Sequence, residues 1–185
     1  MSASFDQCSL YLYPEKHFTL KTSSLISELE KIGLIAKPFI TNKANDKHFY
    51  TGEKYLDHIA YMGCAPNIQF EASNDNEKFC SIKIHQYEQK KLIVSKTQAR
   101  APQCPECKKP VKNWKEKITD ITLFCENCKT STNIEEYNWR KMGGFAQSFI
   151  EITDIFPKEA IPQQSLIDKL SKITHTGWRY FYSCQ

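Results

Sequence analysis

The sequence lacks most of the features by which an enzyme or a membrane protein is recognised. It has only six glycines, no glycine-rich phosphate loop, no H-E-x-x-H metalloprotease motif and no G-x-S-x-G nucleophile elbow. It contains no run of eighteen apolar residues, which excludes a membrane-spanning helix. The first residues lack the basic start and the uninterrupted apolar stretch of a signal peptide. These absences predict a cytoplasmic protein that is not an enzyme and does not contact a membrane.

The composition is that of a folded chain. Hydrophobic residues make up 41% of the 185 residues and aromatic residues 12%, which is ordinary for a protein with a packed core. The length suits one domain with an elaboration or two very small domains. Eight cysteines could form four disulfides in a secreted protein, but without a signal peptide they favour free thiols or metal ligands.

The positive charge is concentrated in one part of the chain. Ten Lys or Arg and three acidic residues lie between Lys83 and Lys117, so this segment carries +7 while the rest of the chain carries −3. A segment of this charge is a candidate surface for a polyanion. The alternative is that the lysines form a solvated face or balance a negatively charged metal site.

Two segments near the ends of the chain resemble each other. Residues 24–32 and 165–173 are identical at six of nine positions, and each has the apolar spacing of an amphipathic helix. Strands are expected on both sides of each helix, at residues 9–14, 34–40, 149–157 and 178–182. The pattern predicts two β-α-β units, although two helices could also share such a pattern by chance.

Two β-α-β units side by side predict an α+β fold with a ferredoxin-like sheet. A further strand is expected near residues 79–87. We expect the sheet domain to comprise residues 1–100 and 134–185, with an inserted module at residues 101–133. So short an insertion buries too little apolar surface to fold alone and needs a covalent or metal staple.

The inserted module contains two Cys-x-x-Cys pairs, Cys104 with Cys107 and Cys125 with Cys128, separated by seventeen residues. This spacing is typical of a zinc site, in which each pair forms a tight knuckle and four thiolates surround one tetrahedral Zn²⁺. We therefore predict one structural zinc ion. A redox Cys-x-x-Cys is less favoured because Pro110 follows where a helix should begin, and iron–sulfur clusters use other spacings.

Residues 101–133 resemble a zinc ribbon, on the strength of the proline-containing CPEC knuckle and the β-prone run ITDITLF before the second knuckle. The resemblance implies a closed, non-catalytic zinc site. The sequence departs from the family where many ribbon knuckles place glycine, just after the second cysteine. Lys108 and Lys129 occupy these positions here.

The remaining four cysteines have no spacing typical of ligands, and we expect each to be a small buried hydrophobic residue. They are Cys8, Cys64, Cys80 and Cys184. His58 and Cys64 could form a nucleophilic pair, but no third residue stands out to orient them. The sequence therefore offers no catalytic residue.

These features together predict a zinc-binding, non-catalytic protein-interaction module, such as a small regulatory or inhibitory protein. Abundant Tyr and Trp support a protein partner, because these types are enriched at binding hot spots. The alternative is a nucleic-acid-binding zinc ribbon that uses the basic segment 83–117, with Trp114 available to stack on a base. The candidate polyanion-binding residues are Lys90, Lys91, Lys96, Arg100, Lys112, Lys115 and Lys117.

Overall fold

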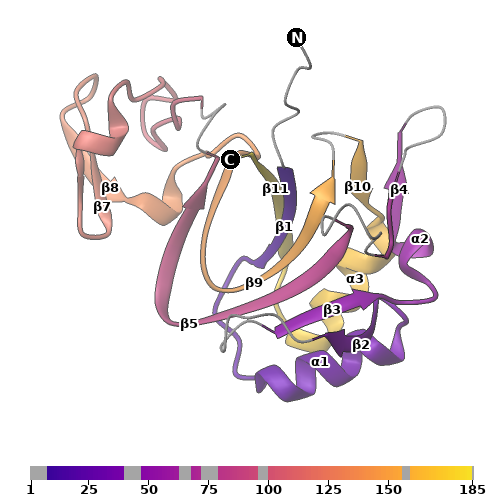
Figure 1. The fold of residues 1–185 in the computed structure, drawn as a ribbon. Helices are drawn as coiled ribbons and strands as arrows, with labels where there is room; N and C mark the ends of the chain where they lie inside the picture. Colours follow the sequence, from indigo (N-terminus) through magenta and orange to yellow (C-terminus); the bar gives the residue numbers. More distant parts are fainter. Residues whose placement is uncertain are drawn as a thin grey trace, which may run out of the picture.

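The fold was determined as a computed structural model, which describes residues 8–39, 47–62, 68–71, 79–95, 100–155 and 159–184. It is an α+β structure dominated by antiparallel strands, as predicted (Figure 1). Within these residues, no helix is long and apolar enough to cross a membrane. The helices are α1 (Thr22–Lys31), α2 (Tyr55–His58) and α3 (Gln164–Thr174), with the 3₁₀ turns η1 (Trp114–Glu116) and η2 (Ile134–Glu136).

The main sheet has six strands in the order β11-β1-β9-β5-β3-β2, and every neighbouring pair is antiparallel. Two smaller sheets are formed by β10 with β4 and by β6, β7 and β8. The main-sheet strands are β1 (Cys8–Pro14), β2 (Ile35–Phe39), β3 (Lys47–Thr51), β5 (Ser81–Val94), β9 (Gly143–Ile155) and β11 (Trp178–Cys184). The short strands are β4 (Ile59–Tyr61), β6 (Ile118–Thr119), β7 (Thr122–Cys125), β8 (Thr130–Asn133) and β10 (Ala160–Pro162).

The strands and helices expected at the two ends of the chain are present. Helix α1 connects β1 to β2, and α3 lies between β9 and β11 after the short strand β10. The ferredoxin-like arrangement is not confirmed, because β5 and β3 stand between β9 and β2 and enlarge the sheet to six strands. The strand expected near residues 79–87 is β5, which continues to Val94.

Gly33, where the sequence predicts the end of the helix, lies just after α1 and its C-cap residue Ile32. The Gly33 N–H bonds the Glu30 carbonyl and the Leu34 N–H bonds the Leu29 carbonyl, at 2.9 and 3.0 Å. This is the Schellman pattern, which requires the left-handed conformation that Gly33 adopts at φ +73°. Leu29 and Leu34 are fully buried, so the stop also seals the helix against the core.

One face of the sheet packs on α1 and α3. The alternating residues Leu10 and Leu12 of β1 and Ile150 and Ile152 of β9 are fully buried there. The matching helix residues are Leu25 and Leu29 of α1 and Leu166 and Leu170 of α3, spaced four apart so that each pair lies on one side of its helix. This is the largest of the three apolar clusters within the described ranges.

The opposite face is covered by the sheet itself. The pairing of β5 with β9 shifts register between Gln86 and Lys91, and beyond this bulge the two strands curl together over the sheet (Figure 1). A second core of Tyr11, Ala146, Phe149 and Phe181 fills the inside of the curl. Gly144 allows the close approach, since a Cβ there would lie 2.7 Å from the Phe181 ring.

The curl brings the far ends of β5 and β9 to the edge strand β11. The Tyr182 N–H donates to the Lys141 carbonyl at 3.1 Å, and the Cys184 N–H donates to the Ser95 hydroxyl oxygen at 3.1 Å. Backbone groups of an edge that would otherwise face solvent are thereby satisfied. The segment 100–142, which we call the finger, lies between these strand ends, well away from α1 and α2 (Figure 1).

Cys8 and Cys184 are buried as predicted, but the expectation that they are free thiols or metal ligands was wrong, because they form a disulfide. They face each other in the register of β1 and β11, although 176 residues separate them along the chain. Sequence spacing carries no information on such a cross-strand pair. Cys80 is a buried free thiol as expected, and Cys64 lies outside the described residues.

A buried carboxylate lies inside the curl. Glu151 of β9 is 6% exposed and accepts hydrogen bonds from Ser9 Oγ at 2.8 Å and from His85 Nε2 at 2.7 Å, with Lys83 Nζ at 4.0 Å. Burial alone raises the pKa of Glu151, but the hydrogen bond from His85 and the charge of Lys83 outweigh it and lower the pKa to about 2.

Because the folded pKa of Glu151 lies below its ordinary value of 4.5, its ionised form stabilises the fold above pH 4.5. This contribution, about 3 kcal/mol, should be lost as the pH falls from 4.5 towards 2. Urea unfolding of the wild-type chain and of Glu151→Gln at a series of pH values would measure it. The variant should show the shallower acid dependence, and equal slopes in the two chains would contradict the prediction.

Candidate metal centre

The two Cys-x-x-Cys pairs form two turns of the same shape. In the first, the Lys108 N–H bonds the Cys104 carbonyl at 3.0 Å, and in the second the Lys129 N–H bonds the Cys125 carbonyl at 2.8 Å. Lys108 and Lys129 both have positive φ, at +58° and +60°. Lysine therefore adopts, at both positions, the left-handed conformation that glycine adopts most readily. Lysine thus replaces the glycine of many ribbon knuckles at both positions, and the shape of the two turns is kept.

The four thiols lie together and could hold a metal ion. All four Sγ atoms are within 4.8 Å of one another, and the Cys104–Cys128 and Cys107–Cys125 Sγ pairs are 3.7 Å apart. A tetrahedral ion with metal–sulfur bonds of about 2.3 Å needs Sγ atoms about 3.8 Å apart, so the spacing fits a thiolate-bound divalent ion. The prediction that these cysteines form one cluster is confirmed.

The elements of the finger position the two turns. Strand β7 ends at Cys125 and pairs with β8, which begins just after the second turn at Thr130. The run ITDITLF thus provides β6 and β7, as predicted for the arm that leads into the second knuckle. The Thr130 hydroxyl lies 3.0 Å from Cys128 Sγ, and this hydrogen bond lowers the pKa of Cys128 to about 6 against the effect of burial. The lowered pKa favours the thiolate form of Cys128, which is the form that binds a cation.

A small apolar core supports the thiols. The Trp114 and Trp139 rings meet edge to face with their centroids 5.0 Å apart. Tyr137 Oη donates to the Leu123 carbonyl at 2.7 Å, and Trp139 Nε1 donates to the Ile134 carbonyl at 2.9 Å. Leu92, Val94 and Phe145, from the strands that flank the finger, pack on the same core. The division of the chain at residues 101 and 133 stays a prediction.

The basic segment is partly neutralised by acids from outside it. Lys90 Nζ lies 2.6 Å from Glu135, Lys117 Nζ lies 2.9 Å from Glu126, and Lys83 faces Glu151. Lys91 and Lys115 lie over the rings of Tyr87 and Trp114, with Nζ 4.7 and 5.6 Å from the ring centroids. Lys112 and Arg100 are exposed, and Lys96 lies outside the described residues.

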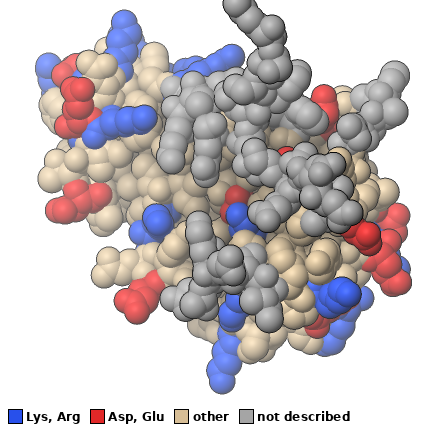
Figure 2. Space-filling model, in the orientation of Figure 1, with Lys and Arg blue, Asp and Glu red and all other residues tan. Residues whose placement is uncertain are grey.

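Figure 2 shows both basic and acidic side chains over the finger on the face drawn, and no continuous surface of one charge. The prediction that Trp114 is available to a base was wrong, since its ring is buried in the finger core with only 7% exposed. Four other aromatic residues are also buried and contribute to the core, so they are not exposed for contact with a partner: Tyr55, Tyr137, Trp139 and Trp178.

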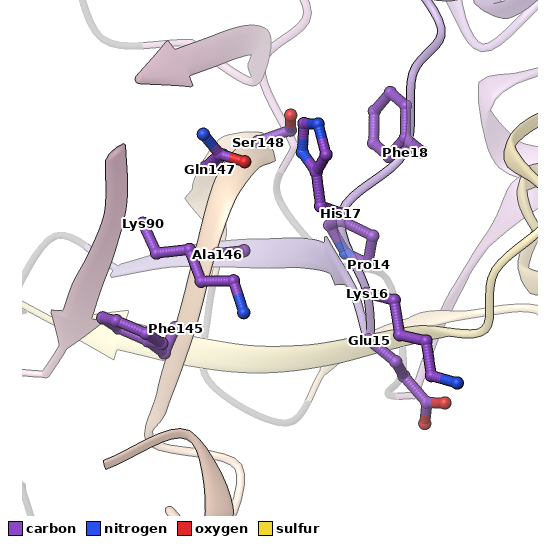
Figure 3. Close-up of a pocket in the computed structure, with 10 residues that line it drawn as sticks. All are labelled: Pro14, Glu15, Lys16, His17, Phe18, Lys90, Phe145, Ala146, Gln147 and Ser148. Carbon is purple, nitrogen blue, oxygen red and sulfur yellow. The ribbon is translucent and has the colours of Figure 1, made fainter. Parts of the chain in front are cut away.

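A small cavity between β1 and β9 is not a substrate cleft. It lies where the chain leaves β1, with Lys90 and Phe145 on one side and Glu15 and Lys16 on the other (Figure 3). Its volume of about 10 Å³ is close to that of a single water site. Lys90 also lies over the Phe145 ring, with Nζ 5.8 Å from the centroid, so its ammonium group is held from two sides.

The remaining nucleophile candidates are occupied by structural contacts where they are described. His58 is 2% exposed, and its Nε2 lies 2.8 Å from the Ile32 carbonyl oxygen. Burial raises the pKa of the Cys80 thiol to about 11 although the Tyr55 hydroxyl, 3.3 Å away, lowers it, so this thiol is protonated at neutral pH. The proposed partner of His58, Cys64, falls outside the described residues.

Comparison of the chain with protein-family models, with curated proteins and with solved structures finds no match. The site must therefore be interpreted from its own geometry.

Sequence reasoning missed two kinds of residue at this site. Thr130 follows the second cysteine pair by two residues, and its hydroxyl could have been recognised as a thiolate partner from that spacing alone. Ile121 and Phe124 are 53% and 40% exposed on the hairpin of β6 and β7. Nothing in the alternation of ITDITLF separates Phe124 from the buried Leu123, because which face points inward depends on the finger core.

We expect Lys108→Gly and Lys129→Gly each to stabilise the metal-loaded protein, because glycine adopts positive φ without the steric cost that lysine bears. The gain should be about 0.5–1 kcal/mol per substitution. Denaturant unfolding of the metal-loaded chains measures it. Lys109→Gly is the matched control, since it removes the same charge beside the same turn without a positive φ to relieve. A similar gain in the control would contradict the explanation.

Proposed function

We propose that this chain is a zinc-binding, non-catalytic protein-interaction module in which a zinc ribbon presents an apolar contact surface. Four cysteine thiolates are the ligand set of structural zinc sites, and their Sγ spacing of 3.7 Å suits that ion. With four protein ligands the ion has no open position for water or substrate, so its role is to fold the finger.

The observation that carries the proposed interaction is the exposure of Ile121 and Phe124 on the β6–β7 hairpin of the finger. The structure describes four exposed large hydrophobic residues, and these two lie three positions apart on one hairpin. Strand β7 of this hairpin ends at Cys125 and pairs with β8, so a metal ion bound by the four cysteines would hold the hairpin that carries these side chains. Rigid, exposed apolar groups lose little conformational freedom on binding, which favours their use as interface anchors.

The arrangement of charged side chains favours a protein partner over a nucleic acid. Nucleic-acid affinity depends on cations that can replace the counterions of phosphates. Lys90 and Lys117 are instead engaged by Glu135 and Glu126. Binding to phosphates would require these pairs to be broken first.

Purified protein should contain about one zinc ion per chain, and Cys104→Ser should lose it, because three thiolates leave the site open and weakly bound. Elemental analysis gives the metal content. The amide spectrum of the variant should show the finger disordered while residues of the main sheet keep their signals. A metal-free native protein with an ordered finger would refute the site.

A photo-crosslinking residue placed at position 124 should capture a protein from an extract of the source cells, and the same residue at position 31 should not. Position 31 is a fair control because Lys31 is exposed on α1, with 65% of its side chain accessible, far from the finger. Excess wild-type protein should compete for the captured species at least tenfold better than Phe124→Asp, which puts a charge on the apolar contact.

Equal capture from positions 124 and 31 would contradict the proposed interface. Sub-micromolar binding of generic DNA or RNA at physiological salt, lost when Lys90, Lys91 and Lys96 are reversed in charge, would replace it with the nucleic-acid function. The two results are distinguishable because phosphate binding weakens steeply with salt, whereas an apolar protein contact does not.

A further inference from the structure

The turn that ends the finger holds two non-glycine residues in the left-handed conformation. Arg140 and Lys141 have φ of +53° and +57°, and the Met142 N–H closes the turn on the Trp139 carbonyl at 2.9 Å. Two consecutive positive φ values are the pattern of a type I′ turn, which strongly favours Asn-Gly. Large cationic residues are unfavourable at both positions, so the fold alone does not explain their presence.

The surrounding structure holds this turn in place. Trp139 anchors one end in the finger core, and the Lys141 carbonyl accepts the Tyr182 N–H of β11. Lys141 Nζ donates to the Tyr180 hydroxyl at 2.8 Å and lies 4.3 Å from the centroid of that ring. Both cations therefore have fixed backbone positions, and the ammonium group of Lys141 has a fixed direction.

The turn borders a groove of about 510 Å³ between the finger and the main sheet. The sheet contributes Tyr13, Phe145, Trp178 and Tyr180 to its lining, and α3 contributes Ile167. A volume of this size with aromatic walls and a few charged groups is typical of a ligand or peptide site.

The charges of the groove leave room for one negative group. Its lining has three acids, Glu15, Glu135 and Glu136, and three cations, Arg140, Lys141 and Arg179. Glu15 pairs with Arg179 at 2.6 Å, and Glu135 pairs with Lys90 from outside the lining. After these pairings, two cations, Arg140 and Lys141, and one acid, Glu136, remain in the lining. Neither cation has a carboxylate within ion-pair distance in the described part of the chain.

Arg140 also has an unsatisfied donor. Its Nε atom is buried and has no hydrogen-bond acceptor among the described residues. A buried donor without an acceptor is unfavourable unless a partner supplies one, and a carboxylate is the acceptor that matches a guanidinium group best. A phosphate chain would suit the groove less well, because Arg140 and Lys141 exceed the remaining acid Glu136 by a single positive charge, which matches one carboxylate.

We propose that this groove binds a partner protein through one carboxylate of an extended peptide segment, with an apolar side chain of that segment against Tyr13 and Phe145. The carboxylate lies at the Arg140–Lys141 turn and accepts hydrogen bonds from the guanidinium group of Arg140. The site is separate from Ile121 and Phe124, so it stands whether or not the hairpin binds a partner.

The test uses the zinc-loaded full chain and three hexapeptides of alternating leucine and a polar residue. The first has glutamate with both ends blocked, the second has glutamine with both ends blocked, and the third has glutamine with a free C-terminal carboxylate. Binding is followed by the amide signals of Arg140, Lys141 and Arg179 and by the indole signal of Trp178. We expect the glutamate or the free-carboxylate peptide to bind at least fivefold more tightly than the blocked glutamine peptide, which also identifies the source of the carboxylate.

The decisive variant is Arg140→Asn with Lys141→Gly. It gives the turn its preferred residues and removes both cations, so the unfolding temperature should rise while the preference for a carboxylate disappears. Glu136→Gln should strengthen binding about twofold by removing the competing acid. The control is Lys31→Gln with Lys172→Gln, which removes the same charge outside the groove and should leave binding unchanged.

Equal affinity for the glutamate, free-carboxylate and blocked glutamine peptides would overturn the proposal, as would a carboxylate preference that survives in the Arg140→Asn and Lys141→Gly variant. If that double variant fails to fold, Arg140→Gln provides the same test, since it keeps an amide donor near the turn but removes the charge. Retained preference in Arg140→Gln would again contradict a carboxylate bound at this turn.

Discussion

The pairing of β5 with β9 is the constraint on which the rest of the structure depends. The two strands form the centre of the main sheet. The finger begins after the C-terminal end of β5 and ends before the N-terminal end of β9. The register shift between Gln86 and Lys91 bends both strands and so creates the second core inside the curl. Because the finger begins and ends on the same pair of strands, this pair forms the base that supports its two Cys-x-x-Cys turns.

The sequence predicted those parts of the fold that depend on local pattern. The spacing of Leu25 and Leu29 and of Leu166 and Leu170 predicted the two long helices. The spacing of the four cysteines predicted that they form one cluster. The bend of β5 could not be predicted from the sequence, because it arises from pairing with β9, a strand some sixty residues away. The same holds for the disulfide, since only the register of β1 against β11 places Cys8 opposite Cys184.

The basic segment shows how a charge count along the chain differs from a charge distribution in space. Lys83, Lys90 and Lys117 belong to the segment, but their acids, Glu151, Glu135 and Glu126, lie outside it. Arg140 and Lys141 were not noticed in the sequence, since their importance depends on backbone conformation and on the absence of nearby acids. Two cations without an acidic partner in the described chain, Arg140 and Lys141, therefore lie outside the basic segment that the sequence indicated.

The bond between Cys8 and Cys184 makes the chain between them a covalent ring. A protease that cuts a surface loop between these residues would open the ring once and leave a single covalent molecule. Its two pieces would separate only when the disulfide is reduced. The finger, which is an excursion from this ring, could therefore be cleaved while β1 and β11 stay joined at the edge of the sheet.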